Sequence, residues 1–295
     1  MNRYEDLKIA EKGAIVSILS YIFLATAKLL IGVWGDSNAL FADGLNNFTD
    51  IIGSLVVFIG LRIARKPIDK NHAYGHWKIE TVASMITSFI MLLIGLEVLG
   101  DAIEKVMHKT YSKPDPLTAL VGIISALIMI FVYFYNRTLA EKVHSSALYA
   151  AAKDNLSDAY TSIGTTVAIL ATVFKFPLLD TIAAIIIAIL VLITALEIFK
   201  ASVFSLSDGF PENLLEKYKK IILSIDEVQE VRLIRGRTYG ANIFLDVVIA
   251  MDPNLSVLQS HSITEIIEKR LSSKYQIYDI DIHVEPYFSP SPKKP

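Results

Sequence analysis

The stretch TIAAIIIAILVLITAL, residues 181–196, contains no charged side chain. It lies within a longer, mostly apolar segment from Leu179 to Phe204. Because about 20 residues of helix are enough to cross the hydrocarbon core of a bilayer, this stretch predicts a transmembrane helix.

Five further apolar segments precede this stretch. They run from Gly13 to Trp34, Ala39 to Ile63, Ile79 to Gly100, Leu117 to Tyr135 and Ala147 to Phe174. The composition agrees, since 53% of the 295 residues are hydrophobic, 20% are charged, and the mean hydropathy is +0.47. Soluble domains are usually less hydrophobic than this. We therefore predict an all-α, six-helix transmembrane domain.

Several classes of protein are excluded by what the chain lacks. It has no cysteine, which excludes disulfides and thiolate metal ligands. Its net charge of −2 gives no reason to expect a nucleic-acid partner. The sequence shows neither a P-loop nor a nucleophile and general-base constellation, so we expect neither an enzyme nor a catalytic cofactor.

Lysine and arginine gather on one side of the predicted bundle. They occur before the first segment (Arg3, Lys8, Lys12), after the second (Arg62, Arg65, Lys66, Lys70, Lys78) and after the fourth (Arg137, Lys142). By the positive-inside rule these parts are cytoplasmic, so we expect a multi-pass protein of the cell membrane with both termini in the cytoplasm. Lys28 lies late in the first segment, and we expect its side chain to snorkel to the outer interface.

The composition changes after Phe204, and the turn residues Ser207 to Pro211 indicate a domain boundary. Hydrophobic periodicity then predicts a helix, two strands, a helix and a strand. These are Glu212–Ile225, Val228–Arg237, Ile243–Met251, Ser256–Leu271 and Ile277–Glu285. The αββαβ order predicts a small α+β, ferredoxin-like cytoplasmic domain with both helices on one face of a three-stranded sheet. We expect the transmembrane domain at residues 1–208, this domain at 209–288 and a disordered tail at 289–295.

Two of the apolar segments carry polar side chains on one helix face. These are Asp43, Asn47, Asp50 and Ser54 in the second segment, with Asn46 beside them, and Asp154, Asp158, Thr161 and Thr165 in the fifth. A carboxylate inside a bilayer is costly unless it is paired, protonated or bound to a cation. Few basic residues are available within these segments, so a bound cation is the expected counter-charge. For Asn46, Asp50, Thr161 and Thr165, polar packing between helices is an equal alternative.

Three motifs resemble the cation diffusion facilitator family. They are the stretch FADGLNN at residues 41–47, the loop DKNHAYGH at residues 69–76, and the pair Asp154 and Asp158. The resemblance covers nearly the whole chain and implies a homodimer that exports divalent metal ions in exchange for protons, with a metallochaperone-like tail. It implies a transport site formed by Asp43, Asn47, Asp154 and Asp158.

The proposed ligands also bear on the choice of metal. Zinc-exporting members of the family have His at the position of Asp154 and Asp at that of Asn47, and this chain departs from both. Four oxygen donors without imidazole suit Mn²⁺ better, relative to Zn²⁺, than a site that contains His, and the chain resembles the manganese-exporting branch. Zinc, iron(II), cobalt and cadmium stay open, because oxygen ligands alone do not reverse the Irving–Williams order. Protons would compete with the metal for the same carboxylates during alternating access.

The resemblance implies three secondary features. A loop site would be formed by Asp69, His72 and His76, with ordinary loop histidines as the alternative. A site in the C-terminal domain would be formed by Asp246, His261, His283 and Glu285, with Arg232 in place of an expected His. Lys78 and Asp208 match an ion pair that locks the membrane helices at the dimer interface, with two solvated charges as the alternative.

Two readings from other classes are a membrane metal sensor that does not transport and an intramembrane metalloenzyme. A measurement of metal uptake into sealed vesicles that contain the purified protein would distinguish a transporter from a metal sensor and from a metalloenzyme.

Overall fold

A computed structural model describes residues 3–35, 38–108, 118–173, 177–275 and 277–288. The chain divides into two compact units, of which the first ends at Val203 and the second begins at Phe204. The predicted disordered tail at residues 289–295 and the predicted segment ends Leu117 and Phe174 lie outside the described residues.

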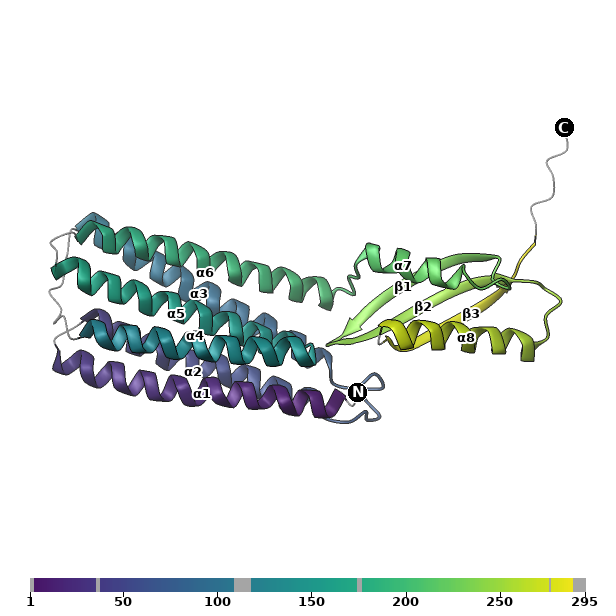
Figure 1. Cartoon of the computed structure of the whole chain (residues 1–295), viewed down its shortest axis with the longest axis horizontal. Helices are drawn as coiled ribbons and strands as arrows, with labels where there is room; N and C mark the ends of the chain where they lie inside the picture. Colours follow the sequence, from purple (N-terminus) through teal and green to yellow (C-terminus); the bar gives the residue numbers. More distant parts are fainter. Residues whose placement is uncertain (1–2, 36–37, 109–117, 174–176, 276, 289–295) are drawn as a thin grey trace, which may run out of the picture. The chain divides into compact units, whose positions relative to one another are not determined.

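The first unit consists of long helices that run side by side (Figure 1). They are α1 (Arg3–Trp34), α2 (Asn38–Ala64), α3 (Lys78–His108), α4 (Thr118–Val143), α5 (Ser146–Val173) and α6 (Pro177–Leu206). Among the described residues, five of these helices contain spans long and apolar enough to cross a membrane. The sixth, α5, has 28 residues and carries Lys153, Asp154 and Asp158. The prediction of a helical transmembrane domain is confirmed.

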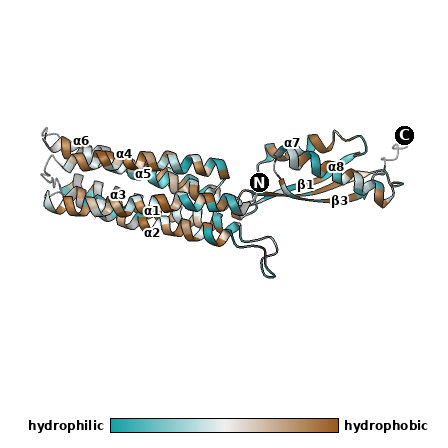
Figure 2. Ribbon diagram, turned by 60° about the horizontal axis from the view of Figure 1, so that its bottom comes forward, coloured by the Kyte–Doolittle hydropathy of each residue, from teal (hydrophilic) through white to brown (hydrophobic). Residues whose placement is uncertain are grey.

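The helices extend beyond the apolar segments that predicted them. α1 begins at Arg3 instead of Gly13, and α4 ends at Val143 instead of Tyr135. The added turns are rich in Glu, Lys, Arg and Ala, which are good helix formers. Hydropathy therefore marks the part of each helix that lies in lipid, whereas the helix itself continues past it. Figure 2 shows hydrophilic residues gathered at the end of the bundle where α1 begins.

Packing inside the bundle brings the acidic helices together. α1 packs against α2 and α4, and α5 contacts α2, α3 and α4. α4 and α5 approach closely at Gly122, where an added Cβ would collide with Thr166 Oγ1; close approach at small residues is typical of membrane helices. Large apolar side chains such as Leu19, Phe23 and Phe131 point outward and are more than half exposed. α5 thus packs against four other helices, α1 to α4, and its acidic residues Asp154 and Asp158 lie on its buried side.

The second unit is the predicted αββαβ domain. Its elements are α7 (Glu212–Ile222), β1 (Glu230–Tyr239), β2 (Asn242–Met251), α8 (Val257–Tyr275) and β3 (Ile277–Pro286). The sheet has the order β1-β2-β3, in which β1 pairs antiparallel and β3 parallel with β2. Alternate residues of β2, namely Leu245, Val247 and Ile249, are buried in one core with Ile222 of α7 and Ile267 of α8. Both helices thus cover the same face of the sheet, and the predicted α+β fold is confirmed.

Candidate metal-binding sites

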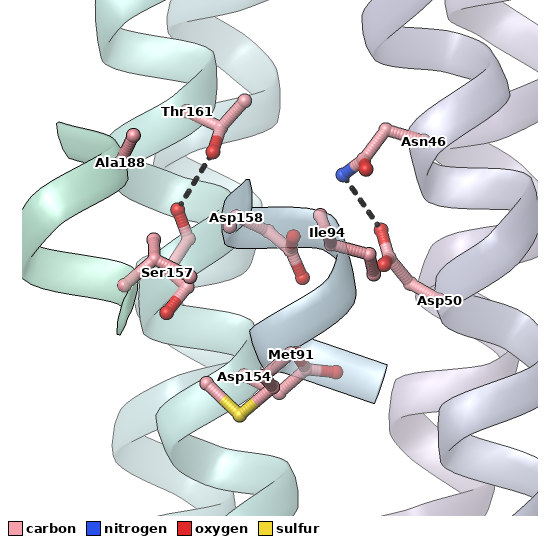
Figure 3. A pocket seen from close by; sticks show the side chains of 11 residues that line it. Asn46, Asp50, Met91, Ile94, Asp154, Ser157, Asp158, Thr161 and Ala188 are labelled. Carbon is pink, nitrogen blue, oxygen red and sulfur yellow. Dashed lines mark hydrogen bonds between the residues drawn. The ribbon is translucent and has the colours of Figure 1, made fainter. Parts of the chain in front are cut away.

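Three buried carboxylates meet within the helical unit. Asp50 of α2 and Asp154 and Asp158 of α5 each offer an oxygen within 4.8 Å of the other two. Figure 3 shows these side chains around one pocket, with Asp50 on one side and the two residues of α5 on the other. The pocket is also lined by Asn46, Met91, Ile94, Gly95, Ser157, Thr161, Ala188 and Val191. Because three ionised carboxylates so close together repel one another, the pocket favours a divalent cation or protons.

Two amides hold the Asp50 carboxylate. Asn46 Nδ2 donates a hydrogen bond to Asp50 Oδ2 at 3.3 Å, drawn in Figure 3, and Asn47 Nδ2 donates to the same oxygen at 3.1 Å. Asn46 and Asn47 precede Asp50 by four and three residues, and positions with this spacing are neighbours on one face of a helix. The helix therefore brings both amides to the carboxylate. Asn46 lines the pocket itself and offers its amide oxygen as a further ligand.

A buried hydrogen-bond network holds Asp158 from the other direction. The Tyr21 hydroxyl of α1 donates to Asp158 Oδ2, and Asn155 Nδ2 donates to the Tyr21 hydroxyl at 2.9 Å. Asn136 of α4 donates to Asn155 Oδ1 at 2.9 Å and to Ser17 Oγ at 2.7 Å. The network joins α1, α4 and α5 and fixes the carboxylate at one end.

The remaining two residues of the predicted transport site, Asp43 and Asn47, contact Lys28. Asp43 Oδ2 is 2.8 Å from Lys28 Nζ, and Asn47 Oδ1 accepts a hydrogen bond from the same ammonium at 2.7 Å. Lys28 is fully buried, so the expectation that it snorkels to the outer interface is wrong. Its partners inside the bundle stabilise the charge where it is. The structure thus brings Asp154 and Asp158 together with Asp50 and Asn46, and it places Asp43 and Asn47 beside Lys28.

The predicted loop residues form a second group of potential ligands. Asp69, His72 and His76 lie between α2 and α3, and their ligand atoms lie within 4.8 Å of one another. His72 Nδ1 is 3.0 Å from Asp69 Oδ1, and His76 Nε2 is 3.5 Å from Asp69 Oδ2. The hydrogen bond with His72 lowers the pKa of the Asp69 carboxyl below its ordinary value. This mixed nitrogen and oxygen set can bind a divalent transition metal.

The predicted site in the second unit has arginine partners for both of its acids. Arg237 Nη1 is 2.6 Å from Asp246 Oδ2, and Arg232 forms an ion pair with Glu285. His261 and His283 are exposed, and His283 Nε2 is 3.9 Å from Glu285 Oε1. Among the described residues of the single chain, the four predicted ligands do not form a group with metal-binding spacing. Arg232, which stands where the family resemblance leads us to expect His, pairs with the negative charge of Glu285.

Lys78 and Asp208 belong to different units. Lys78 is the first residue of α3, and Asp208 adopts a left-handed conformation with φ of 58° after α6. Their pairing stays a prediction.

Sequence reasoning missed Lys28, Tyr21 and the amides Asn136 and Asn155 as parts of the site. A signal existed for Asn155, because it stands inside the fifth apolar segment, where a polar side chain needs a partner. Asn136 comes directly after the end of the fourth segment and gave no such signal. For Tyr21, a single hydroxyl among apolar residues gives no such signal.

Several known proteins are similar in sequence to this chain. Over 286 residues the chain is 45% identical to the manganese efflux system protein MneS of Bacillus subtilis (strain 168), covering 97% of this chain and 99% of that protein. It is 29% identical to the manganese efflux system protein MneP of the same organism, covering 96% and 98% of the two chains. A solved structure of a MamM-CTD variant matches 27% of this chain and all of its own length, with 22% identity and a TM-score of 0.26.

Two family descriptions match nearly the whole chain. Residues 14–207 match the cation efflux transmembrane domain, and residues 210–287 match the cytoplasmic domain of cation efflux proteins. Together with the carboxylate pocket, these matches establish that the chain belongs to the cation efflux, or cation diffusion facilitator, family of multi-pass membrane transporters that export divalent metal ions, and that it is not an enzyme.

Proposed function

We propose that this transporter exports Mn²⁺ in exchange for protons, and that Asn46, Asp50, Asp154 and Asp158 form its cation site. The observation that carries the proposal is the convergence of three buried carboxylates on one pocket. A buried acidic group without positive charge is costly in a membrane, so the pocket needs a cation or protons at every stage.

The choice of Mn²⁺ is supported by the donor set. Asp50, Asp154 and Asp158 offer carboxylate oxygens and Asn46 an amide oxygen, and no histidine or cysteine is among the residues that line the pocket. Hard oxygen donors suit Mn²⁺, whereas imidazole improves a site for Zn²⁺ more than for Mn²⁺. The relatives MneS and MneP are both described as manganese efflux proteins, which supports the same cargo.

Proton exchange is supported by the same charges. When the divalent ion leaves, three carboxylates within 4.8 Å of one another lose its positive charge. Protons from the side of release can replace it, and the protonated site then returns to the cytoplasmic side. Export of one ion is thereby coupled to the import of protons.

We further propose a homodimer with both termini in the cytoplasm. The basic residues before α1, after α2 and after α4 support this orientation by the positive-inside rule. The second unit is small, and association with a second copy would bury more of its surface. We propose that Asp69, His72 and His76 bind a second divalent ion at the cytoplasmic surface.

The test is metal-driven proton flux in sealed vesicles that contain the purified protein, with Mn²⁺ or Zn²⁺ supplied on one side. We expect the wild type to accumulate Mn²⁺ while it moves protons in the opposite direction. Asp50→Asn and Asp158→Asn should abolish both fluxes. Glu141→Gln removes an exposed carboxylate paired with Arg137 on α4, and it should leave both fluxes unchanged.

Each outcome separates the alternatives. Accumulation of Mn²⁺ without proton movement would contradict antiport, and undiminished flux in Asp50→Asn would contradict the site. No accumulation of any divalent ion by the wild type would favour a metal sensor. Asp154→His should shift preference toward Zn²⁺ if the oxygen-only donor set determines selectivity.

A further inference from the structure

A buried lysine lies beside the carboxylate pocket, at the centre of its own set of contacts. Lys28 of α1 has no exposed surface. Its ammonium donates hydrogen bonds to Asn47 Oδ1 at 2.7 Å and to Ser162 Oγ at 3.0 Å, and it lies 2.8 Å from Asp43 Oδ2. The partners come from α2 and α5, the two helices that also carry the carboxylates of the pocket.

One of these contacts, between Lys28 and Asp43, is a buried ion pair. Asp43 is 5% exposed, and neither of its oxygens accepts a regular hydrogen bond from the described residues. The positive charge of the nearby Lys28 ammonium therefore compensates the negative charge of this carboxylate. Breaking a buried ion pair by removing one partner is strongly unfavourable, because the other charge stays buried and uncompensated. While the pair persists, Asp43 offers little net charge to a divalent ion.

The same ammonium determines how one amide is oriented. Asn47 has one oxygen and one NH₂ group; its oxygen accepts from Lys28, and its nitrogen therefore faces the other way and donates to Asp50 Oδ2 at 3.1 Å. Lys28 thus acts on a carboxylate of the pocket through Asn47. Ser162 stands one helical turn beyond Asp158, so the ammonium also ties α5 to this arrangement.

The backbone leaves room for this arrangement at Gly44. A Cβ added there would lie 3.0 Å from Lys28 Cβ and 3.0 Å from the Leu29 nitrogen. Contacts this short require the neighbouring atoms to move, so a glycine allows α2 to pack directly onto the segment of α1 that carries Lys28. Lys28 is thus held between α2 and α5.

We propose that Lys28 is the resident counter-cation of Asp43 and, through Asn47, a positioning residue for Asp50 in the cation site. The inference rests on the proposed function, because it takes the carboxylate pocket as the place where the transported ion binds. It assigns Asp43 and Asn47 to the lysine instead of to the metal. The divalent ion is then bound by Asp50, Asp154 and Asp158 next to a fixed positive charge.

The experiment is equilibrium Mn²⁺ binding to the purified full-length protein by calorimetry, with charge-neutral double variants. In Asp43→Asn the ammonium loses its counter-ion and repels the metal or takes Asp50 as a partner, so we expect binding at least about tenfold weaker. In Lys28→Gln/Asp43→Asn both charges are absent and the Gln amide can still donate to Asn47, so we expect binding within about threefold of the wild type.

A second double variant tests the role of Asn47. Lys28→Met/Asp43→Asn is also neutral in charge but has no donor for Asn47 Oδ1, so the amide is free to turn away from Asp50. We expect it to bind Mn²⁺ at least about threefold more weakly than the Gln double variant. Asp50→Asn with or without Lys28→Gln should not bind Mn²⁺ measurably, and gel-filtration profiles identify any variant that fails to fold.

The outcomes are distinct. If the Gln double variant binds as weakly as Asp43→Asn, Asp43 is a metal ligand and the proposal is overturned. If all Lys28 and Asp43 variants bind like the folded wild type, the pair is only structural and the proposal is also overturned. If the wild type binds Mn²⁺ and the rescue occurs but vesicles show no flux, the transport function fails while the role of Lys28 stands. If Asp50→Asn binds Mn²⁺ like the wild type, both the proposed cation site and the role of Lys28 are contradicted.

Discussion

Tyr21 of α1 donates its hydroxyl hydrogen to Asp158 of α5, and the same hydroxyl accepts a hydrogen bond from Asn155 at 2.9 Å. The phenol has one hydrogen to donate, and the Asn155 amide prevents it from turning that hydrogen toward Asn155. In this arrangement the hydrogen is donated to Asp158. A residue outside the acidic stripes thus orients a carboxylate of the proposed cation site.

Tyr21→Phe removes this donor without a large change in shape. We expect Mn²⁺ transport to fall about tenfold or more, since a hydrogen bond to a charged group contributes about 1.5–3 kcal/mol. Uptake of Mn²⁺ into vesicles measures the effect. Tyr160→Phe, on the same helix as Asp158 but partly exposed, is the control and should behave like the wild type. Equal rates for both variants would show that Tyr21 has no role in the site.

The core of the second unit predicts a contrast between neighbouring residues of α8. Ile267 is fully buried, whereas Ile266 is 44% exposed. Ile267→Ala should destabilise this unit by about 3 kcal/mol through lost burial and the cavity that remains. Ile266→Ala should cost less than about 1 kcal/mol. Hydrogen exchange of the amides of β2 in the full chain measures both, and equal protection in the two variants would contradict the assigned core.

The loop site predicts a shifted titration. Because the hydrogen bond with His72 lowers the pKa of Asp69, this carboxyl stays ionised to a lower pH than an ordinary aspartate. The associated stabilisation is present above the unfolded pKa and is lost as the pH falls through the folded pKa. His72→Ala should raise the Asp69 pKa, as measured by carboxyl carbon NMR. His261→Ala in the second unit should not change it, and an unchanged pKa in His72→Ala would refute the assignment.

The ion pair between Arg232 and Glu285 leads to a prediction about metal binding by the second unit. In an Asp50→Asn/His72→Ala background, which weakens the other sites, Arg232→His should release Glu285 and add an imidazole, so that the chain binds Zn²⁺ there. Arg235→His on the same strand provides the matched control and should add no binding. Losing the ion pair itself should change stability little, because Arg232 and Glu285 are both partly exposed to solvent. Calorimetry with Zn²⁺ measures binding by the two variants. Equal Zn²⁺ binding by both would show that Arg232 is not what prevents metal binding in the second unit.

The fold could be predicted where a local pattern determines it. The uncharged stretch at residues 181–196 lies within α6, and the hydrophobic pattern of residues 243–251 predicted the strand that the structure shows as β2. Both patterns depend on a single element and on its nearest layer. Helix ends were less accurate, because residues 3–12 continue α1 beyond the apolar segment.

The candidate site could be predicted only in part, because the residues that meet there depend on how the helices are positioned along one another. Asp43, Asn47 and Asp50 share a face of α2, and periodicity does not say which turn stands opposite Asp154. The packing of α2 against α5 places Asp50 there. Lys28 was assigned to the interface by its position in the first segment, whereas its partner Ser162 is 134 residues away in the chain.

The most direct test of the central claim is to locate Mn²⁺ by anomalous scattering in crystals of the full-length protein. We predict a peak between Asp50 of α2 and the pair Asp154 and Asp158 of α5, with Lys28 still beside Asp43. A peak between Asp43 and Asn47, with Lys28 displaced, would contradict both the assigned cation site and the role proposed for the lysine.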